Sequence, residues 1–270
     1  MPKRYRISEV AKLLDITPEA IRYYERLGLI NPVRDEKNGY RYYGTWDIHM
    51  LNRARSYHEL GFPLEEGAEL LAKPSDLDVA EALEEREQEL QQEISYEMNL
   101  LRRIRESRAN IRDAASSIGN YRIERRPALY RLHTQNRYEQ DRNPEIQRLM
   151  KEWETHAAFM DSSAMFKLED LYAGNNEFSF GLVLEESYAD FLHVKKSEYV
   201  EYFESCPCLY TAMESRDSVN QGAERYEGLL KEMSRRGFIA NGPLLTRVVV
   251  MRKPDNEYFN LHQMWLPFMV

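Results

Sequence analysis

The chain has 270 residues, of which 43% are hydrophobic, so it can form about two domains with packed cores. Its 37 Lys and Arg residues against 45 Asp and Glu residues give a net charge of −8, which excludes a uniformly basic, histone-like mode of nucleic-acid binding. The sequence has no run of about 18 apolar residues and no apolar signal core near its N-terminus. We therefore expect a soluble, cytoplasmic protein without a membrane partner.

Charge is distributed along the chain in blocks. Residues 1–57 carry 11 basic and 7 acidic side chains, whereas residues 58–100 carry 2 basic and 13 acidic ones. Residues 101–126 are basic again, with 8 against 3. The second and third blocks fit two halves of one solvated helix, which leaves the N-terminal block as the expected docking surface for an anion.

Two helix-start signals lie close together near the N-terminus. Ser8 precedes an amphipathic segment and is the expected N-cap of a first short helix. Thr17 and Pro18 open a second helix, which Gly28 ends. Two short helices joined by a tight turn predict a helix-turn-helix. The second helix is expected to face DNA with Arg22, Tyr23 and Arg26.

A hairpin and two more helices follow. Asn38 and Gly39 form a strong turn dipeptide, and the aromatic residues beside it favour strands, which predicts a basic β-wing. Further helices are expected over 48–60 and 65–71. The alternative, in which these segments are only amphipathic packing elements, is disfavoured by their order, their spacing and the local positive charge.

These elements together resemble the winged-helix signature of MerR-type transcription regulators. The resemblance is carried by Arg22-Tyr23-Tyr24-Glu25, Gly28-Leu29-Ile30, Pro32, Arg34 and Gly39-Tyr40-Arg41-Tyr42-Tyr43. It implies double-stranded promoter DNA and RNA polymerase as partners, and activation by distortion of the promoter. It also implies a set of DNA-binding residues, namely Arg22, Tyr23, Tyr24, Arg26, Arg34, Tyr40, Arg41 and Tyr42.

A long helix with an apolar seam is predicted after this segment. From Leu83 to Ile118 the seam positions follow alternating steps of four and three, with three charged interruptions. No Pro or Gly interrupts residues 78–118, which as a helix span about 60 Å. The MerR resemblance implies that two such helices form an antiparallel coiled coil in a homodimer. Alternatively, the helix packs on the C-terminal part of its own chain.

The rest of the chain predicts two passes of strand, helix, strand, strand. The first pass covers 121–132, 144–160, 164–173 and 177–185, with a hairpin turn at Gly174-Asn175-Asn176. The second pass covers 198–205, 218–236, 243–252 and 256–266. Two such units can form one pseudo-twofold β layer with their helices on one side and a ligand site where the copies meet.

The segments 237–243 and 264–267 resemble the gyrase-inhibitor-like (GyrI-like) effector-binding domain. The expected fold is therefore α+β, with a winged-helix domain at 1–75, a coiled-coil helix at 76–120 and a GyrI-like domain at 121–270. The resemblance implies a lipophilic or aromatic small-molecule inducer, cations included. Gln263 stands where that family commonly has an acidic residue. The aromatic pattern adds candidates to it, and the predicted ligand set is Trp153, Tyr172, Tyr210, Phe259, Gln263 and Trp265, with core packing as the alternative for each aromatic residue.

The sequence leaves three other interpretations of the function open. Cys206 and Cys208 supply only half of a tetrahedral metal site, so incidental thiols are favoured over metal sensing. The six histidines form no metal-binding or nucleophile motif, and neither a cofactor nor a catalytic residue is expected. A small-molecule hydrolase and a drug-sequestering protein remain the alternatives for the C-terminal half. Glu154, Glu185 and Glu186 are the candidates to replace the missing carboxylate.

Overall fold

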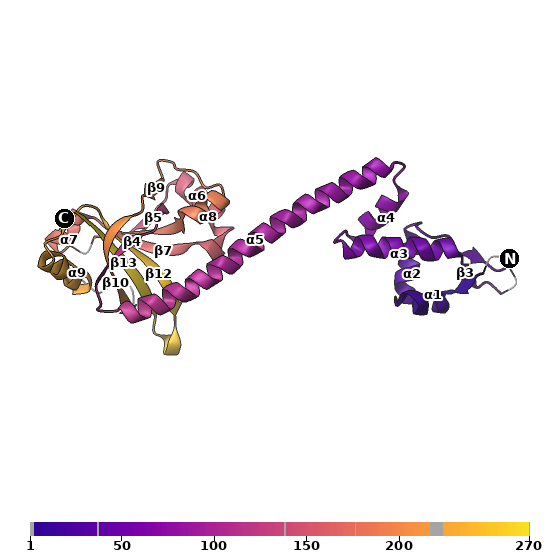
Figure 1. Ribbon diagram of the computed structural model, residues 1–270, viewed down its shortest axis with the longest axis horizontal. Coiled ribbons are helices and arrows are strands. Elements are labelled where there is room, and N and C mark those ends of the chain that lie inside the picture. Colours follow the sequence, from indigo (N-terminus) through magenta and orange to yellow (C-terminus); the bar gives the residue numbers. More distant parts are fainter. Residues whose placement is uncertain (1–2, 37, 138, 176, 217–223, 270) are drawn as a thin grey trace. The chain divides into compact units, whose positions relative to one another are not determined.

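A computed structural model of the chain describes residues 3–36, 38–137, 139–175, 177–216 and 224–269 (Figure 1). The chain divides into two compact units, Met1–Ser95 and Tyr96–Val270. Helix α5 (Asp76–Ser117) begins in the first unit and ends in the second. In the described part of the chain, no helix is both long enough and apolar enough to cross a membrane.

The first unit is a small helical domain with a three-stranded sheet in the order β1-β3-β2. Its elements are β1 (Tyr5–Arg6), α1 (Ile7–Leu14), α2 (Pro18–Arg26), β2 (Val33–Arg34), β3 (Arg41–Tyr43), α3 (Thr45–Glu59) and α4 (Leu64–Ala72). Apolar side chains from α1, α2, β3 and α3 share one core, in which Val10, Ile21 and Tyr43 are fully buried. The order of the elements is that of a winged helix-turn-helix.

The capping residues of the first two helices differ from each other. Thr17 caps α2 as predicted, because its Oγ1 accepts a hydrogen bond from the Ala20 amide at 3.1 Å. The predicted cap at Ser8 is wrong, since α1 already begins at Ile7. Glu9 acts there instead, and its carboxylate accepts the Arg6 amide hydrogen at 2.7 Å.

The second unit contains one large antiparallel sheet. Its elements after α5 are β4 (Arg122–Arg126), β5 (Leu129–Asn136), β6 (Glu139–Gln140), α6 (Pro144–Glu154), η1 (Ala157–Phe159), β7 (Asp161–Phe166), α7 (Leu168–Ala173), β8 (Ser179–Glu185), α8 (Glu186–Phe191), β9 (Val200–Phe203), β10 (Cys206–Arg216), α9 (Glu224–Arg235), β11 (Ile239–Ala240), β12 (Leu244–Arg252), η2 (Pro254–Asn256) and β13 (Phe259–Met269). The strands follow the order β4-β10-β13-β12-β7-β8-β5-β6, while β11 pairs with β13 and β9 with β5.

The sheet is built from two copies of one strand order. The copy β5-α6-β7-β8 is followed by β10-α9-β12-β13, and the copies meet where β12 pairs with β7. The sheet order β10-β13-β12-β7-β8-β5 therefore reads as a pseudo-twofold arrangement about that junction. The predicted doubling is present, although its second copy begins at β10 and not at the predicted strand 198–205.

The helices of the two copies cover one face of this sheet. Helices α6 and α8 lie over β5 and β8, whereas α7 and α9 lie over β10 and β13 (Figure 1). The alternation of side chains along β13 separates the two faces. Met264 and Leu266 pack in the core under α7 and α9, whereas Leu261 packs on the other face against Ala114 of α5.

The structure corrects three predicted segments in this unit. The predicted strand 164–173 ends at Phe166, and the following residues form α7 up to Gly174, whose φ of 68° ends that helix. Asn176 of the predicted turn and the first residues of the predicted helix 218–236 lie outside the described residues. The predicted strand 121–132 is two strands, β4 and β5, interrupted at Pro127. The predicted helix 144–160 ends at Glu154, before the short 3-10 turn η1.

Helix α5 presents two different stripes in its C-terminal half. Leu100, Arg103, Ala114 and Ser117 face their own unit, and Ala114 is completely buried. The predicted seam lies mostly on another face, where six of its apolar members remain 37 to 58% exposed, namely Leu83, Leu90, Ile94, Leu101, Ile104 and Ile118. Its member Ile111 is the exception, because it is partly buried against the cluster of Ala114, Ala212 and Leu261. Packing on the same chain and pairing with a second helix therefore use neighbouring faces of α5 that meet at Ile111.

Candidate functional site

The predicted recognition helix α2 presents a basic and aromatic surface. Arg22 is half-exposed and forms an ion pair with Glu19 at 3.1 Å. Tyr23 donates a hydrogen bond to Glu65 of α4 at 3.1 Å, and the Arg26 guanidinium lies 5.4 Å from the centre of its ring. The α4 contact fixes the Tyr23 ring while Arg22 and Arg26 remain exposed to solvent.

Tyr24 does not belong to this surface. Its side chain is 6% exposed and packs with Ile21 in the core of the first unit. Residues at positions 21 and 24 of one helix share a face, as the helical period requires. The structure therefore assigns Tyr24 to core packing and removes it from the predicted DNA-binding set.

The wing is a hairpin formed by β2 and β3. The Asp35 amide donates to the Tyr40 carbonyl at 2.9 Å, and Gly39 adopts a left-handed φ of 69°, which glycine tolerates without strain. Tyr40 is 58% exposed, and the Arg6 guanidinium lies 5.4 Å from its ring centre. Arg34 on β2 is also exposed, which places a cation on the wing.

The wing is tied to the recognition helix through a carboxylate. Arg41 Nε lies 2.9 Å from Glu25 Oε1, and the Tyr43 hydroxyl donates to Glu25 Oε2 at 3.5 Å. Tyr42 lies between them on β3 and is half-buried. The sequence did not assign roles to Arg6, Glu25 or Glu65. Of these three, only Glu25 belongs to the MerR-type signature. The contacts of Arg6 and Glu65 depend on the tertiary fold, so no local pattern indicates them.

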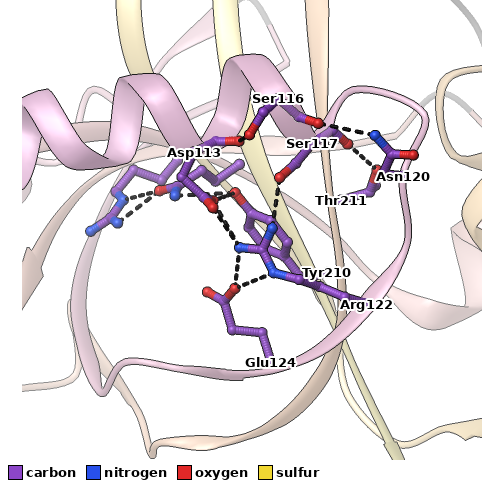
Figure 2. A network of polar contacts seen from close by, with 10 residues as sticks. Asp113, Ser116, Ser117, Asn120, Arg122, Glu124, Tyr210 and Thr211 are labelled. Atoms are coloured by element: carbon purple, nitrogen blue, oxygen red, sulfur yellow. Dashed lines mark hydrogen bonds and ion pairs between the residues drawn. The ribbon is translucent and has the colours of Figure 1, made fainter.

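A polar network joins the end of α5 to the sheet in the second unit (Figure 2). Asp113 of α5 accepts a hydrogen bond from the Tyr210 hydroxyl at 2.7 Å and forms an ion pair with Arg122 at 2.8 Å. Arg122 also donates to Ser117 Oγ at 2.7 Å and pairs with Glu124 at 2.5 Å. Arg122 of β4 and Tyr210 of β10 therefore hold the last turns of α5, and Glu124 holds Arg122 in place.

The same network continues across the face of the sheet that packs on α5. Gln263 Nε2 donates to the Tyr210 hydroxyl at 3.2 Å, and its Oε1 accepts from Arg247 Nη2 at 2.7 Å. Arg247 is 3% exposed and forms an ion pair with Glu185. Its Nε lies 3.9 Å from Asp161. A path of polar contacts therefore crosses from β10 to β8.

This path returns to α5 at a second point. Asp161 also pairs with Arg103 of α5 at 2.5 Å, and Arg103 Nε donates to the Ala158 carbonyl at 3.1 Å. This path of contacts thus connects two positions on α5 that are ten residues apart. It runs through Asp113, Tyr210, Gln263, Arg247, Asp161 and Arg103. Arg247 could have been noticed in the sequence as a single cation within the apolar strand LLTRVVV.

Burial and charge pairing have opposite effects on the pKa values of the carboxyl groups in the network. Burial opposes ionisation of Asp113, but hydrogen bonds from Arg122 and Tyr210 outweigh it and lower the pKa of that carboxyl group. Burial together with the nearby Asp113 raises the pKa of Tyr210, so its hydroxyl remains a donor. Burial also raises the pKa of Asp161, although Arg103 and Arg247 oppose that effect.

The structure brings three of the six predicted ligand residues together. Tyr210, Gln263 and Trp265 lie side by side on β10 and β13, and the ring centres of Tyr210 and Trp265 are 5.7 Å apart. Phe259 lies at the far end of β13, where the Arg252 guanidinium is 4.9 Å from its ring centre. The Nε1 atom of Trp265 is buried and has no hydrogen-bond partner among the described residues.

The two remaining aromatic residues lie elsewhere. Trp153 is 3% exposed in the core under α6 and borders a surface hollow of about 790 Å³ with His193 and Lys196. Tyr172 on α7 is 63% exposed. Both therefore lie apart from the Tyr210–Trp265 surface.

Carboxylates near this surface are paired with arginines or lie away from it. Glu185 pairs with Arg247, whereas Glu186 accepts the Tyr202 hydroxyl hydrogen at 2.6 Å, and Glu154 is exposed. Among the three candidates for the missing carboxylate, Glu185 alone reaches the neighbourhood of Gln263, and it does so through a buried guanidinium.

The two cysteines are neighbours on β10. Cys206 is partly exposed and Cys208 is buried, with 3.7 Å between their Sγ atoms. In the part of the chain that the structure covers, no three His, Cys, Asp or Glu side chains are grouped to hold a metal ion.

Known proteins with similar sequences match the first unit of the chain. Residues 5–73 match the family model described as MerR HTH family regulatory protein. Over 66 residues the chain is 42% identical to the "Heavy metal-dependent transcription regulator 2" of Rhizobium meliloti (strain 1021), which covers 24% of this chain and 45% of that relative. Over 65 residues it is 43% identical to the "HTH-type transcriptional regulator CueR" of Escherichia coli O6:H1, which covers 24% of this chain and 48% of CueR.

The matched region has definite limits. The chain spans about half the length of the curated relatives it matches. A solved structure, the cryo-EM structure of the EcmrR-DNA complex in EcmrR-RPo, aligns with 98% of this chain and 100% of its own, at 15% identity and a TM-score of 0.38. The MerR resemblance is confirmed for the segment that contains β1 to α4, which is a helix-turn-helix of that type.

Proposed function

We propose that this protein is a dimeric, ligand-responsive transcription regulator that binds double-stranded promoter DNA through its first unit. Helix α2 enters the major groove with Arg22, Tyr23 and Arg26, and the wing places Arg34 and Tyr40 on the phosphate backbone. The family match over residues 5–73 supports this assignment, as do the exposed cations of α2 and β2. The proposed role of the whole chain is regulation and not catalysis.

Dimerisation is proposed to use the exposed seam of α5. A groove of about 460 Å³ lies between this seam and the rest of the second unit, with Ile104, Arg108 and Ile111 of the seam on one side and Ala158 on the other. The acidic run 81–97 and the basic run 102–112 would face each other if two copies of α5 paired in antiparallel orientation. The exposed apolar seam, which a second helix would bury, and this complementarity of charge both support a homodimer.

The sensor is proposed to be the second unit, with the GyrI-like arrangement of two repeats. Tyr210, Gln263 and Trp265 are only 0 to 2% exposed, so the proposed inducer enters this buried cluster, which supplies aromatic area and an indole donor without a partner among the described residues. Because Glu185 is paired with Arg247 and Gln263 is uncharged, this surface favours neutral lipophilic aromatics over strong selection for cations.

The observation that carries the regulatory part is the hydrogen-bond path from Gln263 through Tyr210 to Asp113 of α5. A ligand that displaces Tyr210 or Gln263 changes the contacts that hold the end of α5. The bound dimer would then bend promoter DNA so that RNA polymerase can engage it, at a cost of order 1 to 6 kcal/mol. The ligand must therefore prefer the activating form of the dimer.

The test has two parts. A thermal-shift screen of neutral aromatics and lipophilic cations identifies an inducer, since a ligand at 100 times its Kd raises stability by about 2.7 kcal/mol. Operator affinity and promoter unwinding are then measured with and without that compound. We expect unwinding to change more than affinity. If the compound only released the protein from DNA, repression would replace activation.

A further inference from the structure

Two thiols lie next to the proposed ligand surface and take no part in the polar network. Cys206 and Cys208 both belong to β10 and point to the same face, because one residue separates them along a strand. Cys206 is partly exposed, Cys208 is buried, and their Sγ atoms are 3.7 Å apart. A reagent that reacts with Cys206 from solvent therefore has a second sulfur within reach.

The sheet holds the two residues too far apart for a disulfide. Strand β10 is paired on both sides, with Cys206 opposite Arg126 of β4 and Cys208 opposite Pro267 of β13. The Cα atoms of alternate residues on a strand lie about 6.6 Å apart, and because their side chains project in parallel the Cβ atoms stay about as far apart. A disulfide needs Cβ atoms about 3.5 to 4.5 Å apart and sulfurs about 2.05 Å apart. Oxidation to a disulfide would therefore require distortion of a strand that is paired along both edges.

A single atom that bonds to both sulfurs meets no such obstacle. A centre with bonds of about 2.3 Å to each sulfur separates the sulfurs by about 3.8 Å at the tetrahedral angle and by about 3.5 Å at the angle of about 100° in a pyramidal trivalent arsenic. The observed separation of 3.7 Å lies between these values, so small side-chain rotations suffice and the backbone need not move. The geometry therefore favours a bridging atom over oxidation.

The residues opposite the pair on β4 are Arg126, beside Cys206, and Glu124, beside Cys208, and the Glu124 carboxylate is already paired with Arg122. The remaining charge, that of Arg126, disfavours a metal cation. Arg126 is 3% exposed, and its Nε and Nη1 atoms have no hydrogen-bond partner among the described residues. Its buried positive charge opposes a second cation beside it. Burial raises the pKa of Cys208 to about 12, so this thiol keeps its proton at neutral pH, whereas metal binding requires a thiolate. The described residues supply no group of three ligands for a metal ion.

We propose that Cys206 and Cys208 form a dithiol site for neutral reagents that bond two sulfurs through one atom, with trivalent organoarsenicals as the class. In the hydrated reagent, R–As(OH)₂, each thiol displaces one hydroxide. An As–O bond breaks, an As–S bond forms, and the thiol proton leaves with the hydroxide as water. Two water molecules are released, arsenic remains trivalent, and the net charge does not change.

The site lies where such a reaction reaches the polar network. Cys208 shares a buried cluster with Tyr210 and Trp265. Bridging the sulfurs therefore changes the packing beside Tyr210, whose hydroxyl donates to Asp113 of α5. The dithiol reaction itself does not depend on the proposed regulatory function, because it is measured on the protein without DNA.

The test uses phenylarsine oxide and the reduced full-length protein, whose two cysteines make thiol counting unambiguous. We expect one arsenical per chain by intact-mass spectrometry and loss of both free thiols. The adduct should persist in excess glutathione, a monothiol, and be removed by 2,3-dimercaptopropanol. Cys206→Ser and Cys208→Ala should each keep one thiol and lose the arsenical to glutathione, with thermal unfolding measured to verify the fold of each variant.

Three results would overturn the proposal. In the first, glutathione strips the wild-type adduct as fast as it strips the Cys206→Ser adduct. In the second, cadmium alone protects both thiols, which would make this a cation site. In the third, hydrogen peroxide closes an internal disulfide in the native protein. Arg126→Gln is the matched control, because it removes the nearby positive charge and should retain arsenical binding by the neutral thiols.

Discussion

The two units carry their functional groups in opposite ways. In the first unit, Arg22, Arg26 and Tyr40 are exposed to solvent and make few side-chain contacts. In the second unit, Tyr210 and Arg247 are buried, and each has partners on other strands or on α5. A DNA-binding surface must remain open to a large polyanion, whereas a small-molecule sensor must transmit a local change through packed contacts.

This difference determines how each unit responds to mutation. Removing an exposed side chain such as Arg22 leaves its neighbours intact, so the loss appears in DNA binding alone. Removing Tyr210 leaves the buried amide of Gln263 and the partly exposed carboxylate of Asp113 with fewer partners. The comparison therefore predicts separable defects in the first unit and coupled defects in the second.

The largest expected effect concerns α5, which links the two units. Ile94→Asp together with Ile104→Asp places four charges in the seam of a dimer, each buried without a partner at a cost of roughly several kcal/mol. Both residues are more than half exposed in the single chain, so the fold of each unit should persist. We expect loss of the dimer in sedimentation together with loss of operator binding.

The control for this pair is Ala109→Asp. Ala109 is exposed on α5 but lies outside the seam, so the variant adds one carboxylate per chain, against two in the double mutant, without entering the interface. An intact dimer in the seam double mutant, or equal dissociation in the control, would show that α5 does not pair through this stripe.

The second prediction compares base reading with backbone contact in the first unit. Arg22→Ala should cost about 1 to 3 kcal/mol at the operator and relax preference at one base pair. Arg41→Ala should weaken all sequences alike and flatten the salt dependence, because it removes a cation and frees the wing from Glu25. Binding to a series of single mismatches at several salt concentrations checks both, and equal loss of specificity in both variants would contradict these roles.

The same contrast explains how much could be predicted from the sequence. The helix-turn-helix, the wing and the doubled strand order follow from caps, turns and periodicity, which are local signals. Strand β10 was missed because Cys-Pro-Cys at its start resembles a loop, and α7 was mistaken for a strand because its six residues are too few to establish a helical period.

The polar network was beyond prediction for a different reason. Asp113 and Tyr210 are 97 residues apart, and Arg247 and Glu185 are 62 apart, so no local pattern pairs them. The alternation along β13 placed Gln263 and Trp265 on one face as expected. It could not place Trp153 or Tyr172, whose positions depend on how helices α6 and α7 pack.

The third prediction tests the coupling in the second unit. Tyr210→Phe removes the hydroxyl that joins Gln263 to Asp113 and should cost about 1 kcal/mol of stability. Operator affinity without inducer should remain at the wild-type value, while inducer-dependent unwinding is lost. Tyr226→Phe is the control, since it removes a tyrosine hydroxyl bond to the Asn175 carbonyl in the same unit. Unchanged induction in Tyr210→Phe would remove this path from the mechanism.

The smallest expected effect is a pH dependence from Asp113. Its pairing with Arg122 and Tyr210 lowers the pKa in the folded protein below the unfolded value of 3.8. The unfolded chain therefore takes up its proton first as the pH falls, and the stability from this carboxylate is present above pH 3.8 and disappears below it. Because Asp113 and Arg122 are both more than a third exposed, solvent screening keeps this contribution small. Asp113→Asn should thus lower the unfolding midpoint slightly at pH 6, and the gap from wild type should narrow as the pH approaches 3. A gap that stayed constant over this range would mean that the carboxylate charge does not contribute to holding α5 on the sheet.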